Sequence, residues 1–162
     1  MELNPPLSFA AVGWDPLLRL GGAMVAGLLL GIDREVRDHP AGMRTHAIMC
    51  FAAALITLSA LALYYQLGGV HSKADPLRVI EGTAAMAGVI GGALIVFSKG
   101  EVQNLTTAAH IWLAAAIGVA FGAGLYPFAV IGTAVSVVLL SVFRWVERKT
   151  FDEEEESGDG KS

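Results

Sequence analysis

Ionisable side chains are concentrated in one short stretch of the sequence, residues 31–47. This stretch reads GIDREVRDHPAGMRTHA and holds carboxylates, guanidinium groups and two imidazoles, while long apolar runs adjoin it on both sides. Ionisable groups at the edge of a membrane are costly unless they are paired or used. The stretch is therefore the first candidate for a functional site.

The acids and bases of this stretch are spaced for pairing along a helix. If a helix continues past residue 32, Asp33 precedes Arg37 by four positions and Arg34 precedes Asp38 by four. An acid four residues before a base is the favourable order for an ion pair on a helix surface. The simplest interpretation is therefore mutual pairing.

A helix end and a new helix start can be read from the next residues. Pro40 is expected to end the first helix, and the following Ala-Gly pair supplies a loop. Thr45 is expected to cap the next helix, which should begin at about His46.

Two further interpretations of the stretch stay open. One is that its arginines only set the orientation of the chain by the positive-inside rule. The other is a metal site, because Mg²⁺ prefers one or two carboxylates and water, which Asp33 and Glu35, with Asp38, could supply. The nearby arginines would compete for the same oxygens.

The elements that must position these groups are apolar helices. The chain has 162 residues, 54% of them hydrophobic, and a mean hydropathy of +0.58, which favours a bilayer over water as its surroundings. Five segments approach the roughly 20 apolar residues of a membrane span. They are residues 17–32, 47–65, 79–97, 108–123 and 125–143. Only Gly124 separates the last two, so the choice between four and five spans stays open.

The basic residues of the short loops predict an orientation. With five spans, an N-terminus outside and a C-terminus inside places most of the loop arginines and lysines in the cytoplasm. The expected fold is thus an all-α, polytopic transmembrane helix bundle with an outer segment at residues 1–15 and a transmembrane domain at residues 16–146. Residues 147–162 are expected to form an acidic, disordered cytoplasmic tail.

Internal similarity and glycine spacing suggest how the helices are arranged. Asp15-Pro16 and Asp75-Pro76 both resemble helix starts at similar offsets, which suggests a parallel two-helix repeat, although chance similarity is an equal alternative. Glycines four residues apart predict close helix contacts, within the chain or in a homodimer or other homo-oligomer. These pairs are Gly27 and Gly31, Gly88 and Gly92, and Gly118 and Gly122.

Four polar residues in later spans are further candidates. Glu81 is expected to pair with Arg78, the alternative being a role in an ion or proton path. His110 is expected to form a hydrogen bond to a neighbouring helix. Thr106 and Thr107 are expected to cap the fourth span, the alternative being that they face the residue 44–46 loop.

Several function classes are disfavoured. The sequence shows no nucleophile constellation, phosphate-binding glycine loop or metalloprotease motif, so an enzyme is not expected. Basic residues are few and are not interleaved with aromatic ones, which disfavours a nucleic-acid surface. Cys50 is the single cysteine, so no intrachain disulfide can form, and packing is its expected role.

The polar stretch resembles the signature loop of the MgtC/SapB family of bacterial membrane proteins. GIDREVR from Gly31 and PAGMRTHA from Pro40 carry the resemblance, and LTTAA from Leu105 with Trp112 resembles a second signature. The resemblance to the family covers roughly residues 17–143. The chain departs from the family pattern at Asp33, where glutamate is usual, and at Asn104, where glycine is usual. It resembles a short member that lacks the C-terminal cytoplasmic domain of longer ones.

The resemblance implies a role in magnesium homeostasis in the bacterial inner membrane, as a regulator of other membrane machinery. A small oligomeric transporter or channel for Mg²⁺ or protons is the alternative. The expected partners are the lipid bilayer, other copies of the chain or another membrane protein, and no cofactor is expected apart from Mg²⁺. The functional polar residues would be Asp33, Arg34, Glu35, Arg37, Arg44, Thr45, His46, Glu81, Thr106 and Thr107.

Overall fold

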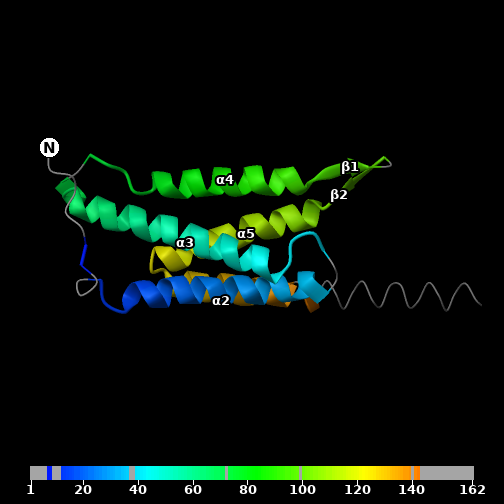
Figure 1. The fold of residues 1–162 in the computed structure, drawn as a ribbon, viewed down its shortest axis with the longest axis horizontal. Helices are drawn as coiled ribbons and strands as arrows, with labels where there is room; N and C mark the ends of the chain where they lie inside the picture. The colour runs from blue at the N-terminus through cyan, green and yellow to red at the C-terminus, as the bar shows by residue number, and fades with distance from the viewer. Residues whose placement is uncertain are drawn as a thin grey trace, which may run out of the picture.

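Helices make up almost all of the regular structure (Figure 1). The computed structural model describes residues 7–8, 12–36, 39–71, 73–98, 100–139 and 141–142. The long helices are α2 (Asp15–Val36), α3 (Met43–Gln66), α4 (Arg78–Leu94) and α5 (Leu105–Gly122), followed by a shorter apolar helix, Tyr126–Leu139. The prediction of an all-α membrane helix bundle is confirmed.

Three of these helices, α2, α3 and α5, are long and apolar enough to cross a membrane. α4 has 17 residues, and the helix Tyr126–Leu139 is also shorter than a full span. Large apolar side chains such as Leu18, Ile48 and Val89 are exposed on the outside of the bundle, where a lipid solvent would accept them. The number of spans and the orientation stay predictions.

α3 is the centre of the bundle. It packs extensively against α2 and α5, whereas α4 rests mainly on α5 and touches α3 little (Figure 1). Successive helices run in opposite directions, so α2 and α4 end at the same end of the bundle, where α3 and α5 begin. The proposed two-helix repeat itself stays a prediction.

Two of the predicted glycine pairs allow the close packing onto α3. A Cβ atom at Gly27 or Gly31 of α2 would overlap the backbone at the start of α3. A Cβ atom at Gly118 or Gly122 of α5 would likewise overlap α3 backbone further along. The predicted close contacts of these glycines are confirmed, and they arise because helix backbones approach most closely where no side chain intervenes.

The third pair, Gly88 and Gly92, behaves differently. A Cβ atom on either residue would meet nothing within 4 Å, so the predicted close contact within the chain is wrong. Gly91 makes the contact instead, since a Cβ atom there would lie 3.1 Å from the carbonyl oxygen of Ala108. The face of α4 that packs on α5 is one position away from the face expected.

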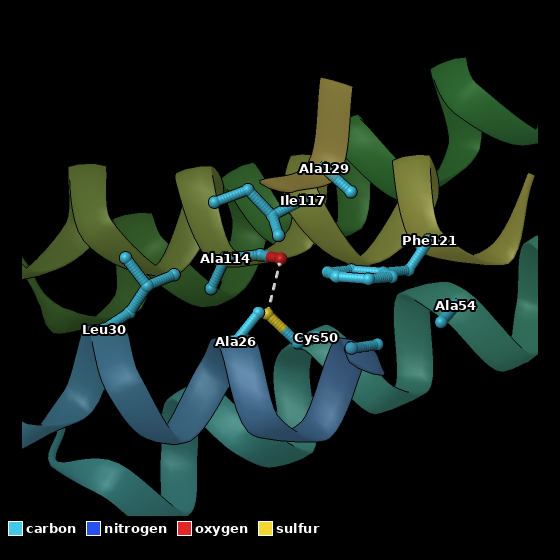
Figure 2. Close-up of a cluster of buried hydrophobic side chains, with 9 residues drawn as sticks. Ala26, Leu30, Cys50, Ala54, Ala114, Ile117, Phe121 and Ala129 are labelled. Carbon is cyan, nitrogen blue, oxygen red and sulfur yellow. Dashed lines mark hydrogen bonds between the residues drawn. The ribbon is translucent and has the colours of Figure 1, made fainter. Parts of the chain in front are cut away.

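Small residues and a few larger apolar ones fill the core where α2, α3 and α5 meet (Figure 2). Leu30 and Cys50 are fully buried there, and the Cys50 thiol donates a hydrogen bond to the carbonyl oxygen of Ala114 at 2.9 Å. Ala129 brings the helix Tyr126–Leu139 to the same core. The packing role expected for Cys50 is confirmed.

The predicted third span is too long at its C-terminal end. α4 ends at Leu94, and the chain then forms an antiparallel hairpin of β1 (Val96–Ser98) and β2 (Glu101–Gln103), in which Phe97 faces Val102. Asn104 closes the hairpin, because its side-chain amide donates to the carbonyl oxygen of Leu94 at 3.1 Å. Its φ of 64° is left-handed, a conformation that glycine adopts freely and asparagine tolerates, which explains the exchange of these residues here.

Some expectations lie outside the described residues. These are the acidic tail and the domain boundary at residues 146 and 147, together with Arg37 and Asp38 and therefore the two helical ion pairs that involve them. The division into segments stays a prediction.

Candidate functional site

One end of the bundle gathers most of the candidate residues. α2 ends there, α3 and α5 begin there, and Asp33, Arg34, Glu35, Arg44, Thr45, His46 and His110 form what we term the polar cluster. The structure thus brings the two signature regions together in space, although they are far apart in the sequence. Glu81 is the exception, because it lies near the start of α4, at the opposite end.

A contact between α2 and α5 lies at the centre of the polar cluster. Arg34 is only 6% exposed, and its guanidinium group reaches the imidazole of His110. The two side chains approach at two points, from Arg34 Nε to His110 Nδ1 at 2.9 Å and from Arg34 Nη2 to His110 Nε2 at 3.0 Å. The hydrogen bond expected from His110 to a neighbouring helix is confirmed.

The protonation state of His110 follows from this geometry. A guanidinium group only donates hydrogen bonds, and a neutral imidazole has a single nitrogen that can accept one. His110 must therefore be neutral, and only one of the two close approaches is a true hydrogen bond. Which nitrogen accepts depends on the tautomer.

His46 is the most enclosed member of the polar cluster. Its side chain is fully buried, Nδ1 lies 2.8 Å from the carbonyl oxygen of Gly42, and its ring meets that of His110 edge to face with centroids 6.2 Å apart. Because a carbonyl oxygen can only accept, Nδ1 carries the proton. Nε2 has no hydrogen-bond partner among the described residues.

The start of α3 is capped from α2. Glu35 Oε2 accepts a hydrogen bond from the backbone N–H of Met43 at 2.9 Å, and the N-cap residue, Gly42, makes no side-chain capping bond. A Cβ atom at Gly42 would overlap the Glu35 carboxylate, so the absence of a side chain there lets this carboxylate reach the helix. A negative group at a helix N-terminus is favourable.

The prediction that Thr45 caps α3 is therefore wrong. The helix begins three residues earlier than expected, at Met43, and Thr45 lies exposed in its first turn. The sequence suggested Thr45 because threonine is a common N-cap, whereas the observed cap comes from a carboxylate eight residues before Met43.

The cap predicted for α5 is also wrong. Asn104 is the N-cap residue and makes no side-chain capping bond. Thr106 is exposed, whereas Thr107 is only 1% exposed and points into the bundle. The open alternative, in which these threonines face the residue 44–46 loop, stays a prediction.

The outward side of the polar cluster is charged. Arg44 and Thr45 are exposed on the first turn of α3, and Glu35 is exposed beside them, while Asp33 is half-buried on α2. The signature residues are thus divided between an inner pair, Arg34 and His46, and this outer surface.

The metal site suggested by the sequence can be compared with the structure. The part of the chain that the structure describes holds no group of three or more His, Cys, Asp or Glu side chains that could bind a metal ion. Glu35 already accepts a backbone hydrogen bond. A magnesium site at Asp33 and Glu35 stays a prediction.

The ion pair expected between Glu81 and Arg78 does not form in this structure. Both side chains are exposed, and no ion pair joins them within the described ranges. Their spacing of three places the two side chains near each other on α4, but an exposed ion pair contributes little, so nothing compels them to pair.

A second polar group, not predicted from the sequence, lies at the other end of the bundle. Arg19 Nε donates to Asp15 Oδ2 at 2.6 Å and its Nη1 donates to the carbonyl oxygen of Gly122 at 2.9 Å. Tyr126 OH donates to Asp15 Oδ1 at 3.0 Å. The four-residue spacing of Asp15 and Arg19 was a usable signal, whereas the contacts across more than 100 residues were not.

Comparison with known proteins identifies the family of the chain. The model of the family described as the MgtC family matches residues 20–149, which include both signature regions. The chain belongs to the MgtC family. It is a membrane protein of that family, and its polar cluster is built from the signature stretches that carried the resemblance.

Individual proteins similar to this chain are consistent with this family assignment. The chain is 31% identical to Protein SapB of Bacillus subtilis, with 83% of this chain and 59% of the relative covered. It is 32% identical to Protein MgtC of Brucella abortus, covering 81% and 54%, and 33% identical to an Escherichia coli K12 protein named "Putative magnesium transporter YhiD", covering 78% and 60%. The chain therefore spans little more than half the length of these MgtC-family relatives. No solved structure matches it.

Proposed function

We propose that this chain acts in magnesium homeostasis as a non-enzymatic protein of the bacterial inner membrane that binds and modulates other membrane machinery. Membership of the MgtC family and the magnesium-related name of the relative YhiD support the link with magnesium. The observation that carries the proposal is the division of the signature residues into a buried pair and an exposed surface.

Two contacts support the shape of that surface. Arg34 ties α2 to α5 through His110, and Glu35 caps α3 from α2. The Glu35 contact fixes where the first turn of α3 lies relative to α2. Arg44 and Thr45 then project outward from a rigid base, which is what a recognition surface requires.

The apolar residues beside this surface support a partner within the membrane. Ile48 is exposed one turn beyond Arg44 on α3, and Val36 is exposed at the end of α2. A partner helix could therefore bury apolar area and still meet charge at the membrane edge. In our proposal this end of the bundle faces the cytoplasm, as the positive-inside rule predicts.

Growth in low magnesium tests the proposal. A bacterium that lacks its own relative of this chain would be complemented with the wild type, with Arg44→Glu and with Lys73→Glu. Lys73 is exposed in the loop before α4, so it is a matched charge reversal at the opposite end. We expect Arg44→Glu to fail and Lys73→Glu to succeed at equal protein levels. Equal growth of the two variants would contradict a role for this surface.

A small oligomeric ion transporter is a second candidate, favoured by one observation. Glu81 is an exposed acid on a helix that is apolar apart from Arg78 and its threonine, and it forms no ion pair with Arg78 in the structure. An ionisable residue within a membrane segment is a candidate for an ion path. The name of YhiD agrees with this role.

Purified protein in liposomes separates the two candidates. Transport predicts a flux of Mg²⁺ or protons that is lost in Glu81→Gln or Asp33→Asn. Regulation predicts no flux in the wild type, together with a membrane partner whose association depends on Arg44.

A further inference from the structure

An open cavity lies between α3 and α4. α4 packs on α5 and touches α3 little, which leaves a space of about 490 Å³ between them. Met49 and Ile56 line it from α3, Met86 and Ile90 line it from α4, and Ala115 of α5 forms its floor. This volume is within the range of small-molecule sites, and the lining is almost entirely apolar.

Two polar groups interrupt the apolar lining. Thr83 is 8% exposed, and its hydroxyl has no hydrogen-bond partner among the described residues. Arg78 lines the cavity at the first residue of α4, and its guanidinium group pairs with no described carboxylate. Glu81 does not line the cavity. A buried hydroxyl without a partner is unusual, which suggests that a bound molecule supplies an acceptor.

The order of these groups along α4 has a chemical meaning. Arg78 comes first, Thr83 follows about 7.5 Å further along at 1.5 Å per residue, and the apolar residues Met86 and Ile90 come last. A phospholipid has the same order, from an anionic phosphate through ester carbonyls to apolar acyl chains. An arginine matches a phosphate, a hydroxyl can donate to a carbonyl, and the apolar lining matches an acyl chain.

We propose that this cavity binds a phospholipid. An acyl chain occupies the cavity between α3 and α4, the ester region accepts a hydrogen bond from Thr83, and the phosphate pairs with Arg78. The charge complementarity at Arg78 favours this occupant over an apolar helix of a second copy, which would leave both polar groups without partners. No residue of the polar cluster lines this cavity.

Native mass spectrometry of the full chain released from detergent tests the proposal. The probes are phosphatidylglycerol, diacylglycerol with the same acyl chains, and glycerol phosphate. We expect phosphatidylglycerol to bind roughly tenfold or more tightly than either of the others, since losing the phosphate or the chains removes one half of the recognition. Equal binding of diacylglycerol, or of glycerol phosphate, would overturn the proposal.

Matched variants locate the site. Gly82→Leu should fill the cavity and abolish binding, because Gly82 lines it and a Cβ atom there meets nothing within 4 Å. Gly88→Leu is the control, since Gly88 has the same free space and does not line the cavity. Arg78→Gln should weaken binding roughly tenfold, with Lys73→Gln as its control.

Thr83→Val gives an independent measurement. It keeps the shape of the side chain and removes the hydroxyl, so we expect weaker phospholipid binding and a thermal midpoint without lipid that is unchanged or higher. If Gly82→Leu instead left phospholipid binding intact and converted a dimer to a monomer, the cavity would be an interface between copies and our proposal would be wrong.

Discussion

The guanidinium group of Arg34 on α2 lies against the imidazole of His110 on α5, with Nε and Nδ1 2.9 Å apart. The two residues are 76 positions apart in the sequence and come from the two separate signature regions. One buried contact therefore joins the signatures, and it holds the charged end of α2 against the start of α5.

Replacing His110 should destabilise the bundle more than replacing both partners. His110→Phe leaves the buried Arg34 charge without this acceptor and should cost about 2–3 kcal/mol, whereas adding Arg34→Met should recover part of that loss. Unfolding in detergent would measure both. Arg44→Gln is the control, because this exposed arginine should change stability by no more than about 0.5 kcal/mol. A larger loss in the double variant would contradict the pairing.

Removal of the carboxylate cap should loosen the start of α3. Glu35→Ala should cost about 1 kcal/mol, and Glu35→Gln should cost less because the amide retains an acceptor oxygen. Gly42→Ala should resemble Glu35→Ala, since its methyl group displaces the same carboxylate. Hydrogen exchange at the Met43 amide would report the change. An unchanged exchange rate in Glu35→Ala would show that the cap contributes nothing.

Glycine substitutions should distinguish the two faces of the bundle. Gly31→Leu should prevent α2 from approaching α3, because even a Cβ atom overlaps the backbone of Met43, and the loss should be at least several kcal/mol. Gly88→Leu should leave the fold intact, because the space around Gly88 is open. Folded yield and thermal midpoint after purification would compare the variants. Equal yields would contradict the observed packing.

The polar group at the other end should depend on Gly124. This residue has a φ of 74°, and a Cβ atom would lie 2.9 Å from the guanidinium carbon of Arg19. Gly124→Ala should therefore cost more than about 1 kcal/mol, both from backbone strain and from displacement of Arg19. Tyr126→Phe removes one partly exposed hydrogen bond and should cost less. Thermal unfolding would rank the two, and the reverse order would be evidence against the strained turn.

Cys50 should be inert in the folded protein. Its side chain is fully buried, and its thiol donates a hydrogen bond to the carbonyl oxygen of Ala114 (Figure 2). A membrane-permeant maleimide should therefore label the chain only when the core opens, and His110→Phe should shorten the labelling time. Rapid labelling of the native wild type would show that the core is more accessible than the burial of Cys50 implies.

The sequence was sufficient for the class of fold and for the main region of interest. Apolar length predicted helices, and the glycine spacing of α2 and α5 predicted close contacts that the structure contains. Both follow from local rules, because a helix places residues four apart on one face. The C-terminal end of α4 was harder to predict, because the apolar residues Val96 and Phe97 are compatible with a helix and with a strand.

The geometry of the polar cluster could not be predicted in the same way. The sequence singled out Arg34 and His110 separately, but nothing in it showed that they touch. It also suggested Thr45 as the cap of α3 where Glu35 supplies it. Both contacts depend on how α2 packs against α3 and α5, and local patterns contain no information on which side chains of different helices meet.

The distance of 76 positions between Arg34 and His110 in the sequence has a consequence for biosynthesis. A ribosome completes α2 and α3 before it makes α5, so the contact between Arg34 and His110 can form only after α5 has been synthesised. The helix pair α2 and α3 can therefore be inserted into the membrane early, but it reaches its final packing only after α5 has emerged.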